Sequence, residues 1–239
     1  MVIRSLTQFL TRTLQKDKAG VDQIIAQLEP IERNTKRMMN IINHLRTFSR
    51  QSKKDFSSAN INNVIEDCFL MIGEQLRLRN IEVVKNLSPG LPLVQCDTNH
   101  MEQVFLNIIS NARDAIVSKI KLMGTDTKFI GKLEIVTRYE LVEHDSQSTS
   151  RAEIQMDLAS EGPSFPQKEV EILIKDNGTG MTPEVHEKIF DPFFTTKATG
   201  EGTGLGLSIS YGIIKDHKGE IEVLTTGPDG TVFRIRLPV

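Results

Sequence analysis

The sequence contains only two cysteines, Cys68 and Cys96, and each lies inside an apolar or extended stretch. Two thiols placed in this way form neither a disulfide framework nor the paired spacing of a zinc site. The shortage of cysteine therefore predicts a protein of a reducing compartment, and we expect a cytoplasmic location.

An excess of charge of either sign is absent as well. The 29 Lys and Arg residues are opposed by 31 Asp and Glu residues, which leaves a net charge of -2. This balance provides no field that would hold nucleic acid or an anionic membrane, so any phosphate binding must be local. The sequence also lacks an apolar run near the roughly 18 residues of a membrane span, and it lacks a secretory signal. We expect a soluble fragment with no nucleic-acid partner and no membrane contact of its own, whereas its parent protein could be membrane-anchored.

Two stretches near the N-terminus have the spacing of amphipathic helices. A heptad-like run covers residues 21–48, a shorter run covers 3–14, and the polar stretch 15–20 supplies a turn. Residues 1–54 are therefore predicted to form part of an antiparallel helical hairpin. Its apolar seam favours a homodimer in which two hairpins make a four-helix bundle, although two helices of a monomeric bundle would give the same pattern. The seam residues are Leu28, Ile31, Thr35, Met38, Ile42 and Leu45.

The pattern changes to mixed helix and strand after the polar joint at residues 51–55. Helical spacing marks two stretches, and β-branched or alternating runs mark five strands, so residues 55–239 predict an α+β fold. We expect a two-layer α/β sandwich in which helices cover one face of a single sheet. The polar segment at about 142–167 is predicted to be a surface loop. The expected helices cover 61–76 and 101–117, and the expected strands cover 81–84, 132–137, 169–175, 220–224 and 231–237.

Three polar residues share one face of the helix expected at 101–117. Asn107, Asn111 and Asp114 are separated by steps of four and three, and asparagine is a poor residue for a helix interior. A solvated polar face would explain this pattern. A functional explanation is that the amide oxygen of Asn111 coordinates Mg²⁺, which takes few protein ligands besides water and phosphate oxygens.

Two glycine-containing segments suggest contact with a ligand. Asp176 ends an expected strand and is followed by Gly178 and Gly180, which would let backbone approach a ligand closely. The alternating glycines at 200–206 precede an apolar helix, an arrangement that directs amide donors toward a phosphate. A turn without a ligand and a flexible linker are the corresponding alternatives.

The ordered set of motifs is more specific than any one of them. The motifs are Asn-x-x-x-Asn-Ala-x-Asp-Ala, Asp-x-Gly-x-Gly, a phenylalanine-rich stretch, Gly-x-Gly-x-Gly and Gly-Thr-Val-Phe. Together they resemble the N, G1, F and G2 boxes of sensor histidine kinases, which share the Bergerat ATP-binding fold with DNA gyrase and a heat-shock chaperone. Residues 37–50 resemble the second helix of the dimerisation hairpin of these kinases.

The resemblance implies that the chain binds ATP and Mg²⁺. Asp176 would accept a hydrogen bond from the adenine amino group with Thr231 nearby, and Asn111 would hold Mg²⁺ between the phosphates. Lys197 would contact phosphate and Phe190 would anchor the nucleotide lid, although a solvated lysine and ordinary core packing explain these two residues nearly as well. The remaining nucleotide-binding residues implied are Asp114, Gly178, Gly180, Gly202, Thr203, Gly204, Leu205 and Gly206.

Asn107 separates branches of this superfamily. Members that hydrolyse ATP carry a glutamate four residues before the metal-binding asparagine, and this glutamate is similar to a general base that activates water. An amide takes no proton at neutral pH, so Asn107 favours phosphoryl transfer to a protein group over hydrolysis. Asn107 and the Mg²⁺ ligand Asn111 are the expected catalytic residues. The resemblance also implies a response regulator receiver domain as partner.

The resemblance breaks at the phosphate acceptor. The family carries it as a histidine on the first hairpin helix, followed by an acidic residue and a proline, and none of the five histidines here lies in such a motif. We expect a kinase core cut inside its first helix. A natural nucleotide-gated module without an acceptor, and a serine kinase of the anti-sigma type, are the alternatives; the predicted hairpin argues against the second.

Overall fold

The computed structural model of the chain describes residues 56–124, 129–142, 167–197 and 202–239, with five separate positions between 25 and 35. Lys54–Glu187 and Ser210–Val239 form one compact unit, whereas Lys188–Ile209 belongs to another. The five separate positions are helical, and Thr35 Oγ1 donates to the carbonyl of Ile31 at 2.8 Å. The rest of the predicted hairpin, the seam residues Met38, Ile42 and Leu45, and residues 143–166 of the predicted loop lie outside the described residues.

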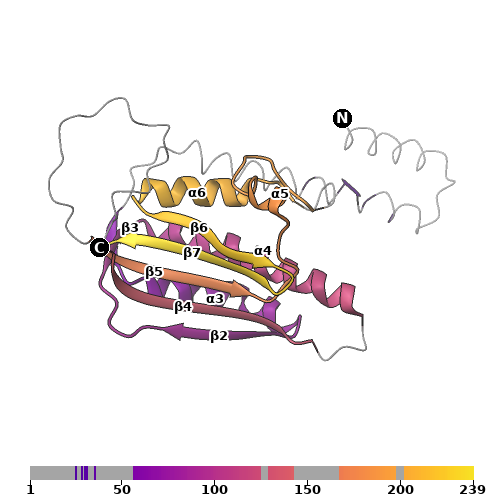
Figure 1. The fold of residues 1–239 in the computed structure, drawn as a ribbon, viewed down its shortest axis with the longest axis horizontal. Helices are drawn as coiled ribbons and strands as arrows, with labels where there is room; N and C mark the ends of the chain where they lie inside the picture. Colours follow the sequence, from indigo (N-terminus) through magenta and orange to yellow (C-terminus); the bar gives the residue numbers. More distant parts are fainter. Residues whose placement is uncertain are drawn as a thin grey trace. The chain divides into compact units, whose positions relative to one another are not determined.

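A mixed five-stranded sheet forms the centre of the larger unit (Figure 1). Its strand order is β2-β4-β5-β7-β6, and only β2 and β4 run parallel. A separate pair, β1 and β3, is antiparallel. The bounds are β1 Ser57–Ala59, β2 Ile81–Leu87, β3 Val94–Cys96, β4 Gly131–Val142, β5 Gln167–Asp176, β6 Glu220–Gly227 and β7 Gly230–Pro238.

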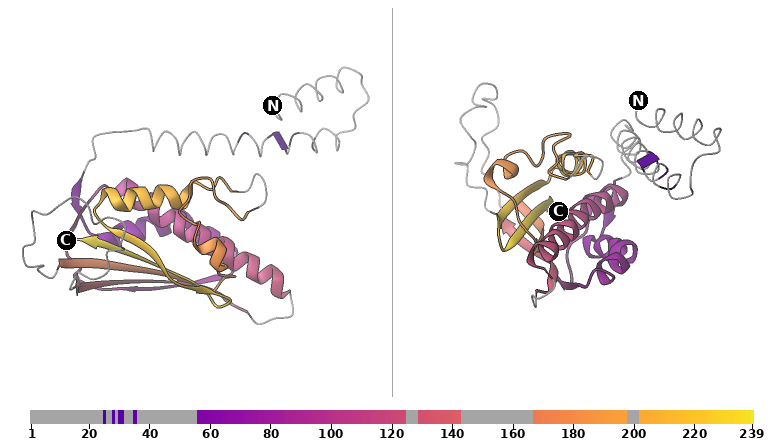
Figure 2. Two further views of the ribbon diagram at one scale, coloured as in Figure 1. Left: turned by 45° about the horizontal axis from the view of Figure 1, so that its top comes forward. Right: turned by 90° about the vertical axis from the view of Figure 1, so that its right-hand side faces the viewer.

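Two long helices, α3 (Ile61–Arg77) and α4 (Thr98–Met123), cover one face of this sheet (Figure 2). Each begins at a side-chain cap: Asn60 accepts from the amide of Asn62, and Asp97 accepts from the amides of Asn99 and His100. The predicted Bergerat-type sandwich, with helices on one face, is confirmed. The helix expected at 101–117 begins three residues earlier than predicted, at Thr98, because its cap is Asp97.

Two further helices are short. They are α5 (Pro183–His186) and α6 (Gly206–Asp216). The elements α5, β1 and β3 were not predicted, because segments of three or four residues are too short to show a periodic pattern of apolar residues. Within the part of the chain that the structure describes, none of the helices has the length and apolarity needed to cross a membrane.

The core lies between the sheet and helices α3 and α4. Along β7 burial alternates strictly, so Phe233, Ile235 and Leu237 are buried while Arg234 and Arg236 lie on the other face. On α4 the buried side chains recur at three- and four-residue steps, among them the fully buried Phe105, Ile109 and Ile116. The period of two in the strand and of 3.6 in the helix explains why the sequence predicted both elements.

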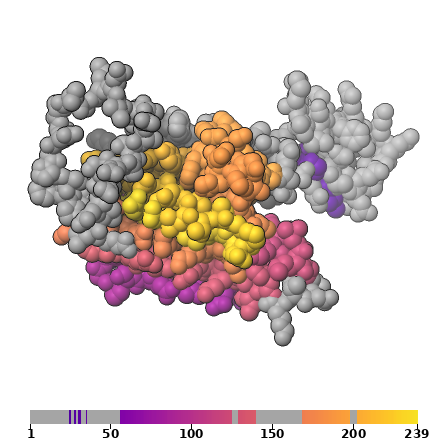
Figure 3. Space-filling view, viewed as in Figure 1, coloured from indigo at the N-terminus to yellow at the C-terminus, as the bar shows by residue number. Residues whose placement is uncertain are grey.

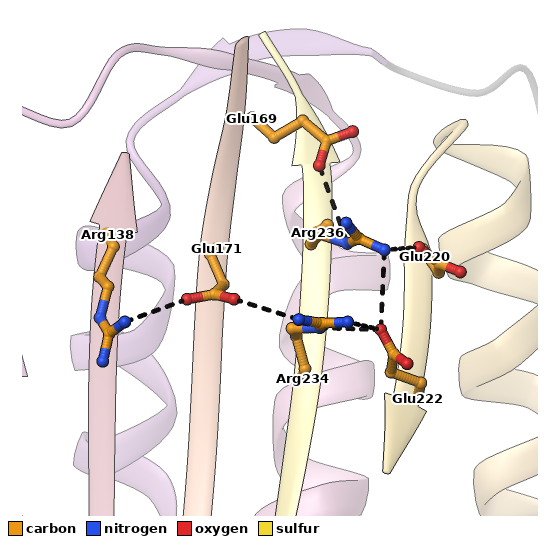
Figure 4. A network of polar contacts seen from close by, with 7 residues as sticks. All are labelled: Arg138, Glu169, Glu171, Glu220, Glu222, Arg234 and Arg236. Carbon is orange, nitrogen blue, oxygen red and sulfur yellow. Dashed lines mark hydrogen bonds and ion pairs between the residues drawn. The ribbon is translucent and has the colours of Figure 1, made fainter. Parts of the chain in front are cut away.

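The opposite face of the sheet carries charged side chains that pair across the strands (Figure 4). On β5, Glu171 lies 3.8 Å from Arg138 on β4 and 3.9 Å from Arg234 on β7. Arg234 also pairs with Glu222 on β6, where the neighbouring pair is Arg236 with Glu220. This series of pairs keeps the face polar, and in the space-filling view β6 and β7 form a band across it (Figure 3).

Candidate functional site

The predicted adenine-binding carboxylate lies at the end of the central strand. Asp176 is the last residue of β5 and is paired in register with Thr231 on β7. Its half-buried side chain turns back on the following turn, where Oδ1 accepts a hydrogen bond from the amide of Gly178 at 2.8 Å. Burial raises the pKa of the Asp176 carboxyl to about 6, because loss of water disfavours the charge more than the Gly178 and Thr231 amides and the Lys119 ammonium favour it.

The glycines after Asp176 are required by neighbouring parts of the protein. A Cβ on Gly178 would lie 2.7 Å from the backbone of Ala115 on α4. Gly180 has a φ of +66°, and a Cβ there would lie 1.8 Å from the carbonyl oxygen of Gly227. The turn at 176–180 therefore packs closely between α4 and the β6–β7 hairpin. This packing requires glycine at both positions, whereas the sequence analysis attributed the two glycines to contact with a ligand.

Two threonines add polar groups beside this turn. Thr231 is buried, and its Oγ1 lies 3.2 Å from Oγ1 of Thr226 on the adjacent strand β6. The same Thr226 oxygen accepts a hydrogen bond from the amide of Met181 at 2.9 Å. The sequence analysis did not single out Thr226. A hairpin between the two expected strands pairs Thr226 with Thr231, so its place beside Thr231 follows from the register of that hairpin.

The three polar residues of α4 have different surroundings, and all three are half-buried. The Asn107 Nδ2 atom donates to Oγ of the buried Ser210 on α6 at 3.1 Å, so Asn107 links the two helices. Asp114 accepts two hydrogen bonds from the guanidinium of the preceding Arg113, at 2.9 and 2.7 Å. Asn111 occupies the turn between them.

The donors on α4 suit a hard cation that is held mainly by its substrate. Within the described ranges, no group of three or more His, Cys, Asp or Glu side chains is arranged to hold a metal ion. A neutral amide oxygen such as that of Asn111 fits Mg²⁺, because this ion keeps several waters and takes phosphate oxygens in place of a protein cage.

The glycine-rich segment belongs to the smaller unit, together with the phenylalanine-rich stretch. Gly204 has a φ of +67°, and a Cβ there would lie 2.3 Å from the backbone of Phe193. A Cβ on Gly202 would lie 2.5 Å from Oγ1 of Thr195. Gly204 therefore meets backbone of the phenylalanine-rich stretch and Gly202 meets its side chains, so a side chain at either glycine would collide with that stretch.

The other predicted residues of the smaller unit differ in burial. Leu205 is buried and follows Thr203, whose Oγ1 accepts from the Leu205 amide at 3.4 Å. Gly206 begins α6. Lys197 is exposed, whereas Phe190 is half-buried, so the deepest side chain of that stretch is the neighbouring Ile189.

Lys119 also contacts the turn after Asp176, and the sequence did not single it out. Its Nζ donates to the backbone carbonyls of Asn177 at 2.9 Å and Pro228 at 2.7 Å. The Asn177 side chain in turn accepts from the amide of Lys132 and donates to the carbonyl of Ile130. No motif in the sequence could have identified Lys119, because the partners of its side chain are backbone carbonyls.

Comparison with known proteins identifies the family to which the chain belongs. The model of the histidine kinase-, DNA gyrase B-, and HSP90-like ATPases matches residues 96–239, more than half of the chain. The two-component sensor PprA of Pseudomonas aeruginosa is 30% identical over 91% of this chain and 20% of its own length. Sporulation kinase E of Bacillus subtilis is 29% identical over 99% of this chain and 26% of its own length. The chain thus spans about a quarter or less of these relatives.

Solved structures agree in fold. The catalytic domain of the histidine kinase ThkA is 27% identical, with a TM-score of 0.54, over 77% of this chain and 97% of that domain. ThkA in complex with the response regulator protein TrrA matches 99% of this chain and 58% of that chain at 22% identity, with a TM-score of 0.62. The chain belongs to the histidine kinase-, DNA gyrase B- and HSP90-like ATPase family, and it carries the catalytic ATP-binding domain of a sensor histidine kinase.

Proposed function

We propose that this chain is a sensor kinase core that binds Mg-ATP and transfers the γ-phosphoryl group to a histidine, for relay to the receiver domain of a response regulator. The observation that supports it best is the half-buried Asp176 at the end of β5, between α4 with Asn111 and the hairpin with Thr231. A carboxylate held in such a place is an acceptor suited to an exocyclic amine. The response regulator is proposed because the similar kinase ThkA was solved with one.

The proposed roles follow the motifs. Asp176 accepts from the adenine amino group near Thr231, and Asn111 holds Mg²⁺ between the phosphates. In the smaller unit Phe190 supports a lid in which Lys197 and the amides of residues 202–206 contact phosphate. Gly178, Gly180 and Asp114 line the nucleotide.

Asn107 is proposed to position the transfer reaction without acting as a base. Its amide donates to Ser210 and takes no proton at neutral pH. Phosphoryl transfer depends mainly on positioning and on charge neutralisation, so a strong base is not required. This favours transfer over hydrolysis of ATP.

The histidine that would accept the phosphoryl group distinguishes a histidine kinase from a module that only binds nucleotide. Both ring nitrogens of the buried His217 are engaged, with the amide of Asp97 and the carbonyl of Ile213, and His100 pairs with the Asp97 carboxylate. His44 and His144 lie outside the described residues. The lack of an acceptor motif favours, as a second candidate, a nucleotide-gated module that regulates a partner. Dimerisation through residues 1–54 is part of the kinase proposal.

A labelling experiment separates the two functions. The chain alone, given ATP labelled in the γ-phosphate, should gain no acid-labile, base-stable phosphate, because transfer needs a nucleophile within about 3–3.5 Å of phosphorus. A related longer kinase that carries the acceptor histidine and an inactivated metal-binding asparagine should be labelled when mixed with this chain. The matched control is this chain with Asn111→Ala, which should label nothing. ATP binding without transfer to any such partner would favour the nucleotide-gated module, and absence of ATP binding would contradict both.

A further inference from the structure

Lys119 joins three parts of the ATP-binding domain at one point. It projects from α4 two turns after Asn111, and its Nζ donates to carbonyl oxygens on both sides of Asp176: Asn177 in the turn after β5 and Pro228 in the β6–β7 hairpin. The ring of Phe129 lies 5.0 Å from the same Nζ and covers the ammonium. A cation placed in this way satisfies one carbonyl in the turn after β5 and one in the β6–β7 hairpin.

The contacts of α4 with the turn follow the helix repeat. Ala115 meets Gly178 so closely that a Cβ on that glycine would lie 2.7 Å away, and Lys119 holds the carbonyl of Asn177 one helical turn later. On the hairpin side, a Cβ on Gly230 would lie 1.8 Å from the carbonyl oxygen of Asp176. The backbone of Asp176 is thereby fixed from two sides, with Lys119 as the side chain that connects them.

The charge of Lys119 acts on the Asp176 carboxylate as well. The amides of Gly178 and Thr231 also favour the ionised form, and burial opposes it. Lys175 is adjacent in sequence but pairs with Glu134 on the opposite face of the sheet, and Asp229 lies exposed in the hairpin turn. Among the described residues, Lys119 is therefore the ammonium that compensates the half-buried Asp176 carboxylate from the helix side.

We propose that Lys119 is a positioning residue for nucleotide binding, which fixes the turn after Asp176 to the β6–β7 hairpin and thereby holds the Asp176 carboxylate in place as an acceptor. This inference rests on the proposed role of Asp176 toward adenine. Removal of the ammonium would leave the burial of Asp176 less compensated, so the carboxyl would take up a proton at a higher pH. A protonated carboxyl loses its charge-assisted hydrogen bond to an amine.

The test compares Lys119→Met and Lys119→Arg in the full chain, with Lys121→Met as the matched control on an exposed position of the same helix. Affinity for Mg-ATP is measured by calorimetry from about pH 5.5 to about pH 8.5, and the Asp176 carboxyl is titrated by NMR without nucleotide. Lys119→Met should weaken binding about tenfold at neutral pH, and both the loss of affinity and the Asp176 titration should move to higher pH. Lys119→Arg should restore most of the affinity, and Lys121→Met should match the wild type. If Lys119→Met does not fold, Lys119→Gln provides a neutral donor for the same measurements.

The outcomes distinguish this inference from the proposed function. A wild-type chain that binds no ATP at any pH contradicts the function itself. Wild-type and Lys119→Met chains that bind equally, with an unchanged Asp176 titration, overturn the inference while ATP binding stands. A uniform loss of affinity at every pH with an unchanged Asp176 titration reduces Lys119 to a structural residue and also overturns it.

Discussion

Replacing Asp176 by asparagine should stabilise the folded chain and weaken ATP binding at the same time. The wild-type carboxyl has its pKa raised from 3.8 to about 6 by burial, so the folded state binds a proton more tightly than the unfolded state. At about 1.4 kcal/mol per pKa unit, this difference corresponds to roughly 3 kcal/mol. Stability should therefore fall as pH rises between these two values, and the full penalty should persist at neutral pH.

Asparagine removes this penalty and retains an oxygen that can accept the Gly178 amide. The variant should be more stable than the wild type by up to about 3 kcal/mol near pH 8, and the two should converge near pH 4. Its affinity for ATP should fall by roughly 1–3 kcal/mol, because the amide matches the adenine amine less well than a carboxylate. Asp229→Asn, in the exposed hairpin turn, is the control and should change neither quantity.

Urea unfolding at several pH values gives the stability, and calorimetry gives the affinity. Equal stabilities of wild type and Asp176→Asn from pH 4 to pH 8 would refute the argument that the carboxylate is held at a desolvation cost. Unchanged ATP affinity in the variant would remove Asp176 from the adenine role. The two measurements are independent, so either link can fail alone.

Two further predictions concern the scaffold of the site. Gly180→Ala should destabilise the chain by more than about 2 kcal/mol in urea unfolding, because the φ of Gly180 is +66° and an added Cβ would collide with backbone. The control Gly73→Ala, on the open side of α3, should stabilise the chain by about 0.5–1 kcal/mol. Equal effects of the two substitutions would contradict the packing of the turn. Burial lowers the pKa of His217, whose Nε2 accepts the amide of Asp97, so its contribution to stability should be present above about pH 6.5 and lost as pH falls through its folded pKa. His217→Gln should abolish that component of the pH dependence, and an unchanged difference between pH 5 and pH 7 would exclude His217 as its source.

The longer helices and strands were predictable because their core positions repeat. Phe233, Ile235 and Leu237 alternate along β7, and Met101, Phe105 and Ile109 follow the helical period on α4. The segments β1, β3 and α5 are too short for such a repeat and depend on tertiary pairing. The register of β5 with β7, which sets Thr231 opposite Asp176, likewise comes from the folded sheet.

The sequence by itself determined the family of the site, because Asn111, Asp176 and the alternating glycines stand in the same order as the motifs of that family. It did not identify Lys119, since the partners of that side chain are backbone carbonyls, which every residue possesses and which leave no motif. It also could not explain Gly178 and Gly180, whose nearest neighbours come from α4 and the β6–β7 hairpin. Side-chain chemistry is local and is written in the sequence, whereas backbone contacts and burial arise only when distant segments are brought together, and these set the pKa of Asp176.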